Sequence, residues 1–134
     1  MKTLWLKTRR GVEPHEQVEL TPDTPLPCIF EIGSHGDWRP RGLREADRLR
    51  ITFDGSAWTA RLLCGDLGAS GLRIIGDLVL YAPLVVRLGN TYFFVDDVRD
   101  PVAKTISAEA LSRRHAEVAS SPGSSPSSGP SGRE

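Results

Sequence analysis

Cysteine is scarce in this sequence, and the placement of its two cysteines excludes several kinds of site. Cys28 and Cys64 lie far apart in the chain, and neither belongs to a C-x-x-C pair. Structural zinc sites need closely spaced cysteine and histidine ligands, so the sequence predicts no metal site. We expect two free, partly buried thiols, and a disulfide only if the Cα atoms of the two residues lie within about 7 Å of each other.

Long apolar runs and an excess of one charge are also missing. Lys7, Arg9 and Arg10 interrupt the N-terminal segment before the apolar core of a signal peptide can form. No run approaches about 18 apolar residues, the length that spans a membrane. The 17 basic residues balance 17 acidic ones, so global charge favours neither nucleic acid nor an anionic membrane as a partner. We expect a cytoplasmic protein without a membrane span.

The residue groupings of known catalytic motifs do not occur either. The histidines, His15, His35 and His115, stand in no metal-binding or nucleophile motif, and we expect His15 and His115 to be solvated. The glycine-rich stretch 65–76, GDLGASGLRIIG, matches neither G-x-G-x-x-G nor the P-loop pattern. A phosphate loop also needs a helix N-terminus, whereas the isoleucines at 74–75 favour a strand. We therefore expect no catalytic residue, no cofactor and no enzymatic activity.

Short apolar segments, several of them alternating with polar residues, occupy the first hundred residues. Strands are expected at 4–6, 17–20, 28–32, 49–53, 58–63, 72–75, 78–81, 84–87 and 92–95. The Asp-Gly pair at 54–55 and the Leu-Gly-Asn triplet at 88–90 are typical of hairpin turns. The pattern predicts an all-β domain over residues 1–100, an antiparallel β-sandwich or barrel rather than a βαβ fold.

A single helix and a tail are expected after this domain. Ser107 can cap a helix that ends near residue 119, within the segment 101–119, and Leu111, His115 and Val118 share one weakly apolar face. Residues 120–134, SSPGSSPSSGPSGRE, contain no aliphatic or aromatic side chain. Such a segment cannot bury enough apolar surface to offset its ordering entropy, so we expect a disordered tail.

The order of strands and turns resembles that of a forkhead-associated (FHA) domain. The matching segments cover roughly residues 3–98: Phe30–Gly33 (F-x-I-G), Arg48–Ile51, Phe53–Trp58, Asp66–Gly76 (the D-L-x-S-x-N-G-T-x-x-N-G segment with one residue deleted) and Leu84–Val95. The resemblance implies a sandwich of about eleven strands whose apical loops, here 33–50 and 65–71, bind a protein partner. In that family the ligand is a phosphothreonine peptide.

The residues that would recognise phosphate differ from the FHA pattern. Ser34 stands at the family arginine, Glu45 and Arg48 at the S-x-x-H pair, and Ile75 at the asparagine. Because phosphate binding depends on charge-assisted hydrogen bonds, Glu45 and Ile75 argue against it. We therefore expect a non-enzymatic, phospho-independent protein-interaction module, a signalling or assembly adaptor. Ser34, Arg44 and Arg48 would contact anions, and an exposed Trp38 would serve as an apolar anchor.

A second resemblance, to PilZ domains, uses some of the same residues. Arg44 and Arg48 form the R-x-x-x-R motif, and Asp66–Gly71 has the spacing of [D/N]-x-S-x-x-G with Gly68 in place of serine. This resemblance implies a six-stranded barrel that binds cyclic-di-GMP through Arg44, Arg48, Asp66, Gly68 and Gly71. Guanidinium groups can clamp phosphates and stack on guanine.

The arginine-rich stretch 38–50 leaves further partners to consider. Its five arginines are partly neutralised by nearby acidic residues, so it is either a solvated loop with internal ion pairs or an anion-binding face. Nucleic acid is not expected, because only Trp38 is at hand for stacking. The other aromatic residues, Tyr92 and Phe94 among them, are expected in the core. Consecutive apolar residues over 78–95 leave homodimerisation open.

Overall fold

The computed structural model describes residues 2–120, which form eleven strands and one helix. The elements are β1 (Leu4–Arg10), β2 (Glu13–Leu20), β3 (Cys28–Gly33), β4 (Arg48–Phe53), β5 (Trp58–Cys64), β6 (Leu67–Ala69), β7 (Leu72–Arg73), β8 (Asp77–Val79), β9 (Leu84–Leu88), β10 (Thr91–Asp96), β11 (Lys104–Ser107) and α1 (Ala108–Ser120). The expected tail lies outside the described residues, except that Ser120 ends α1.

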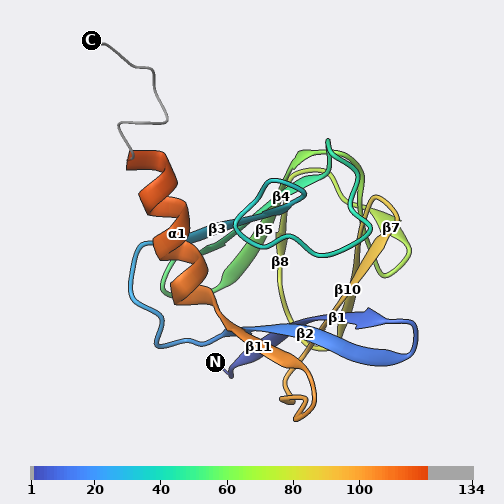
Figure 1. Ribbon diagram of the computed structural model, residues 1–134, viewed down its shortest axis with the longest axis horizontal. Coiled ribbons are helices and arrows are strands. Elements are labelled where there is room, and N and C mark those ends of the chain that lie inside the picture. The colour runs from blue at the N-terminus through green and yellow to red at the C-terminus, as the bar shows by residue number, and fades with distance from the viewer. Residues whose placement is uncertain (1, 121–134) are drawn as a thin grey trace.

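The strands form two sheets, so the predicted β-sandwich is confirmed (Figure 1). The larger sheet has the strand order β11-β2-β1-β10-β9-β6-β7, and the smaller has the order β3-β4-β5-β8. Every described pairing is antiparallel except that of β11 with β2, which is parallel. Helix α1 lies beside β3, at the edge of the smaller sheet (Figure 1).

The core lies between the two sheets and follows from the alternation of the strands. In β3 and β4 every second side chain is buried, and Phe30 pairs in register with Ile51. Phe53 stacks on Trp58 with ring centroids 4.8 Å apart, and the Trp58 side chain is fully enclosed. Period-two burial of this kind holds a strand in one register, because a slip of one residue would turn the apolar side chains to solvent.

Two strands were not expected, whereas the helix begins directly after Ser107, the residue expected to cap it. β6 is only three residues long and lies within the glycine-rich stretch, where the pattern indicated turns. β11 pairs with β2 over Lys104–Ser107, so the helix begins at Ala108. β11 has a mostly exposed burial pattern, which explains why alternation did not predict it.

Several side chains lie in environments that differ from the expectation. Tyr92 is 54% exposed rather than in the core, and Phe94 is only half-buried. The cysteines are free as expected, but Cys64 is exposed rather than partly buried. Val118 is exposed, and His115 is hydrogen-bonded to Asp37 rather than solvated. Within residues 2–120 no helix is long and apolar enough to cross a membrane.

Candidate functional site

The carboxylate of Asp47 organises one end of the sandwich, which we call the apical end and which comprises residues 34–47, 65–76 and 89–90. The Asp47 side chain is 1% exposed. Its Oδ2 atom accepts a hydrogen bond from the backbone N–H of Arg44 at 2.9 Å, and the Arg44 guanidinium donates to both carboxylate oxygens. The buried charge is therefore paired and hydrogen-bonded, as a stable fold requires.

Two glycines allow the other loops to approach this carboxylate. A Cβ atom at Gly65 would lie 2.7 Å from Asp47 Oδ1, and one at Gly89 would lie 2.5 Å from Asp47 Oδ2. Both glycines also have positive φ, +108° and +61°, which side chains disfavour. Asp47 thus brings the loops that contain residues 34–47, 65–66 and 89–90 together, as the FHA resemblance predicted for 33–50 and 65–71.

The two arginines predicted to contact an anion are already occupied by carboxylates of the chain. Arg44 is held by Asp47, and Arg48 donates to Glu31 Oε1 at 2.8 Å. Arg50 donates to the other oxygen of Glu31 at 2.9 Å. Burial raises the pKa of Glu31, but hydrogen bonds from Arg48 and Arg50 outweigh burial and lower it below its ordinary value. Of the two interpretations of the stretch 38–50, ion pairing with carboxylates of the chain describes Arg44, Arg48 and Arg50.

The carboxylate of Asp66, in the glycine-rich stretch 65–76, is also paired with arginines of the chain. Asp66 pairs with Arg87 at 3.1 Å and lies 3.8 Å from Arg73. Gly68 lies under the Arg87 guanidinium, because a Cβ atom there would be 2.9 Å from Nη2. Gly71 has φ +80° and follows Ser70, whose φ is 51°. These two residues make the two-residue turn between β6 and β7, a conformation with positive φ at both positions.

Trp38 does not lie where it was predicted to lie, while the anion contact of Ser34 stays a prediction. Ser34 Oγ donates to the backbone oxygen of Glu45 and so links two parts of the loop. Trp38 was expected to be an exposed anchor but is 4% exposed. A tight turn at Gly36 folds the chain back, so that Trp38 bridges to Ile32 and its ring packs edge-on against Phe93 at 5.7 Å. Its indole N–H donates to Glu16 at 3.0 Å. Trp38 is therefore a core residue.

Exposed apolar side chains mark the β6–β7 hairpin instead. Leu72 is 68% exposed and Ile75 is 88% exposed, whereas Ile74 between them is partly buried against the core. The sequence signal for this feature was the presence of isoleucine where the FHA pattern has asparagine. Sequence reasoning treated that change as a loss of phosphate contact and missed the apolar surface that it creates.

Eleven strands in two sheets, with long loops collected at one end, define the class of fold, and solved FHA-domain structures share it. The FhaA FHA domain, in its complex with the intracellular domain of Rv3910, superimposes with a TM-score of 0.51 at 17% identity. The match covers 69% of this chain and 98% of that one. An FHA domain from a study of phosphothreonine-dependent FHA interactions superimposes with a TM-score of 0.54 at 18% identity, covering 74% of this chain and all of that one.

These comparisons establish an FHA-like fold. No protein-family model matches the sequence, and no curated protein matches it. Two open sheets, rather than one closed six-stranded barrel, give no support to the PilZ resemblance, and cyclic-di-GMP binding stays a prediction. Within the described residues no three His, Cys, Asp or Glu side chains are grouped to hold a metal ion.

Proposed function

We propose that this chain is a non-enzymatic protein-interaction module that binds an unphosphorylated segment of a partner protein at its apical end. Such a module would serve as an adaptor in signalling or assembly. Support for a protein partner comes from the FHA-like fold, since the FhaA domain was solved in complex with another protein. The observation that carries the proposal is the chemistry of the apical end in this chain.

Phosphate recognition at the apical end would need arginines that are free to donate. Arg44, Arg48 and Arg87 are instead paired with Asp47, Glu31 and Asp66. A phosphate that reached these guanidinium groups would have to displace a carboxylate, and it would meet the exposed carboxylate of Glu45. Replacing one anion by another of the same sign gives little net free energy.

The same end offers apolar surface to a partner. Leu72 and Ile75 project from a hairpin that is held in place by the β6–β9 ladder and by the backbone hydrogen bond from Ile74 to Leu67. Exposed aliphatic side chains on a rigid element bury area on binding without a large ordering cost. This arrangement favours a ligand with apolar side chains.

A peptide library in which every sequence is present with threonine and with phosphothreonine tests the proposal. We expect the best ligands to bind equally well in both forms, within about twofold, since Arg44, Arg48 and Arg87 are already paired with carboxylates of the chain. Leu72→Ser/Ile75→Ser should weaken these ligands by about tenfold or more, the loss of roughly one buried aliphatic side chain.

Val98→Ser/Val102→Ser is the matched control, because it removes two aliphatic side chains that are also exposed, at 63% and 76%, but lie elsewhere. This control should bind as the wild type does. Binding that requires phosphothreonine, or that falls equally in both double variants, would contradict the proposal.

A further inference from the structure

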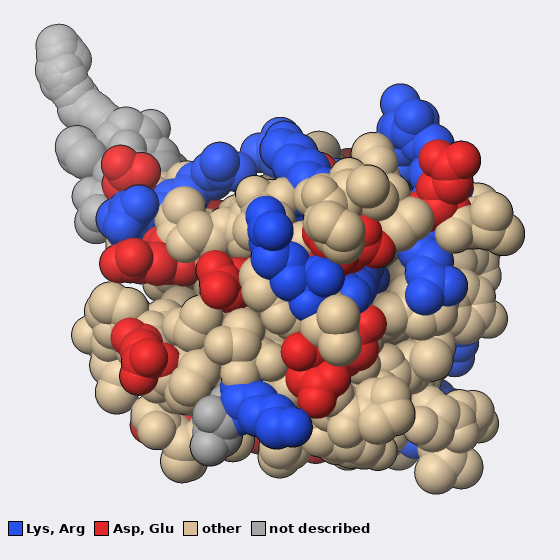
Figure 2. Space-filling model, turned by 90° about the horizontal axis from the view of Figure 1, so that it is seen from below, with Lys and Arg blue, Asp and Glu red and all other residues tan. Residues whose placement is uncertain are grey.

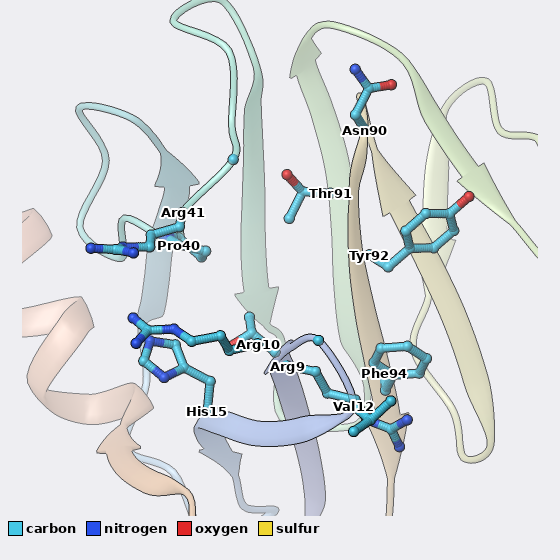
Figure 3. A pocket seen from close by; sticks show the side chains of 13 residues that line it. Arg9, Arg10, Val12, His15, Pro40, Arg41, Asn90, Thr91, Tyr92 and Phe94 are labelled. Carbon is cyan, nitrogen blue, oxygen red and sulfur yellow. The ribbon is translucent and has the colours of Figure 1, made fainter.

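A pocket of about 590 Å³ at the margin of the apical end, which shares residues 40–42 and Asn90 with it, collects positive charge that the fold does not neutralise. It lies between the β1–β2 turn, residues 40–42 and the start of β10. Figure 3 shows Arg10, His15 and Arg41 on one side of it, and Arg9 with Phe94 and Tyr92 on the other. No aspartate or glutamate lines it.

The four cationic or titratable side chains of this pocket differ from Arg44, Arg48 and Arg87 in having no carboxylate partner. Within residues 2–120, Arg9, Arg10, Arg41 and His15 form no ion pair, while Arg9 lies 4.3 Å from the centroid of the Phe94 ring. Glu13 is opposite Arg10 in the β1–β2 ladder but does not line the pocket. Glu16 accepts a hydrogen bond from the Trp38 indole N–H.

This local excess contrasts with the balanced charge of the whole chain. The chain has no net charge, and on the face shown in Figure 2 Lys and Arg side chains lie next to Asp and Glu. Uncompensated guanidinium groups on several elements around one hollow create a local positive potential, which attracts an anionic ligand.

The backbone around the pocket suits an extended peptide. The ladder between β1 and β10 stops at the Lys7–Phe94 pair, although β1 continues to Arg10 and β10 begins at Thr91. A register shift between Thr8 and Arg9 accompanies this divergence. Backbone groups of Thr8–Arg10 and Thr91–Phe93 are therefore left outside that ladder, where an added strand can use them.

The charges lie on two sides of the pocket rather than at one point (Figure 3). Arg10, His15 and Arg41 come from two strands and a loop, and Arg9 lies on the opposite side with the aromatic rings (Figure 3). Successive same-face side chains of an extended peptide lie about 7 Å apart, so several single negative charges would match this spread better than one phosphate dianion. Tyr92 and Phe94 add apolar area for the stems of such side chains.

We infer that this pocket binds an extended segment of a partner protein that is rich in Asp and Glu. The inference rests on the proposed function only in that the partner is a protein, and it assigns a second contact region distinct from Leu72 and Ile75. The carboxylates would accept hydrogen bonds from Arg10 and Arg41, and the strand would lie between the ends of β1 and β10.

Fluorescence anisotropy of fluorescein-labelled octaglutamate, titrated with the protein at low salt, tests the inference. The comparison probes are octaglutamine, a phosphothreonine peptide and an oligothymidylate, all of equal length. We expect octaglutamate to bind and octaglutamine not to bind. Arg10→Ala/Arg41→Ala should weaken binding by about tenfold or more, which is the effect of one charge-assisted hydrogen bond. Amide chemical shifts should change at Arg10, Arg41 and Thr91.

Arg99→Ala/Arg113→Ala is the matched control, because it removes the same charge from exposed positions outside the pocket. It should change octaglutamate binding by no more than about twofold, as expected for screened surface charge. Leu72→Ser/Ile75→Ser should leave octaglutamate binding unchanged, so failure of this inference and failure of the apical proposal are separable.

Three results would overturn the inference. Octaglutamate could fail to bind. Alternatively, both arginine double variants could weaken octaglutamate binding equally, which would indicate only diffuse electrostatic attraction. Tighter binding of the phosphothreonine peptide or of the oligothymidylate, lost in Arg10→Ala/Arg41→Ala, would assign the pocket to phosphate or to nucleic acid instead of an acidic segment.

Discussion

The imidazole Nδ1 atom of His115 lies 2.9 Å from the carboxylate Oδ2 atom of Asp37, which joins helix α1 to the loop after β3 across 78 residues of sequence. The same carboxylate oxygen accepts the backbone N–H of Glu31 at 2.8 Å, and the backbone oxygen of Asp37 accepts a bond from Arg114 at 2.8 Å. Asp37 is 8% exposed. One buried aspartate therefore both shapes the loop that buries Trp38 and anchors the helix.

Replacing His115 tests this anchor. His115→Ala should lower the free energy of unfolding by about 1 kcal/mol, because it leaves one oxygen of a buried carboxylate with a bond fewer. Urea unfolding followed by tryptophan fluorescence measures the change. His35→Ala is the control: its pair with Glu45 is 3.5 Å long between side chains that are 76% and 87% exposed, so it should change stability very little. Equal effects of the two substitutions would show that the His115–Asp37 contact does not anchor the helix.

The contact between Gly89 and Asp47 predicts a large difference between two glycine substitutions. Gly89→Ala should destabilise the fold by about 2–4 kcal/mol, because the new methyl group meets the Asp47 carboxylate and the backbone stays left-handed. Gly71→Ala has the same backbone penalty, at φ +80°, but its Cβ meets nothing within 4 Å, so about 1 kcal/mol is expected. Chemical denaturation measures both, and a similar cost for both would contradict the close approach to Asp47.

The Glu31 carboxylate predicts a pH dependence. Its pKa is lowered in the folded state by Arg48 and Arg50, so its stabilisation is present above the pKa of the unfolded chain and is lost as pH falls through the folded value. Glu31→Gln should therefore cost about 1 kcal/mol at neutral pH, since the two partner arginines are partly solvated. The difference from wild type should vanish in acid.

Urea unfolding of both proteins across the acidic range measures this difference, and Glu45→Gln serves as an exposed control. A cost for Glu31→Gln that is the same in acid as at neutral pH would show that the ionised carboxylate is not the stabilising group.

The two thiols should differ in reactivity. Cys28 is 1% exposed, and burial raises its pKa; a hydrogen bond with Ser112 opposes this effect, and the charge of Glu109 adds to it. Cys64 is exposed. Because the thiolate is the reactive form, iodoacetamide should modify Cys64 about tenfold faster or more. Intact-mass measurements should show one modification in wild type and almost none in Cys64→Ser over the same time. Two modifications at equal rates would contradict the burial of Cys28.

Local patterns were sufficient for most of the sheet architecture. Short apolar segments, several of them alternating with polar residues, located nine strands, and the Asp-Gly and Leu-Gly-Asn turns fell where two hairpins form, since both signals depend on neighbouring residues alone. β11 could not be predicted in this way, because its position depends on pairing with a strand that begins more than eighty residues earlier.

The chemistry of the site depended on long-range contacts. From sequence, Arg44 and Arg48 were candidates for anion binding and Trp38 for an exposed anchor, since a residue type does not reveal its partners. The fold placed Glu31 against Arg48 and Arg50, which are 17 and 19 residues away in sequence, and buried Trp38 against Phe93, whereas Asp47 pairs locally with Arg44, three residues before it. Three arginines that form no ion pair within residues 2–120, Arg9, Arg10 and Arg41, lie instead around a pocket where β1, β10 and residues 40–42 meet. Residue type thus determined which charges the protein carries, while the tertiary structure decided which of them are neutralised, because ion pairing and burial depend on distance in space and not along the chain.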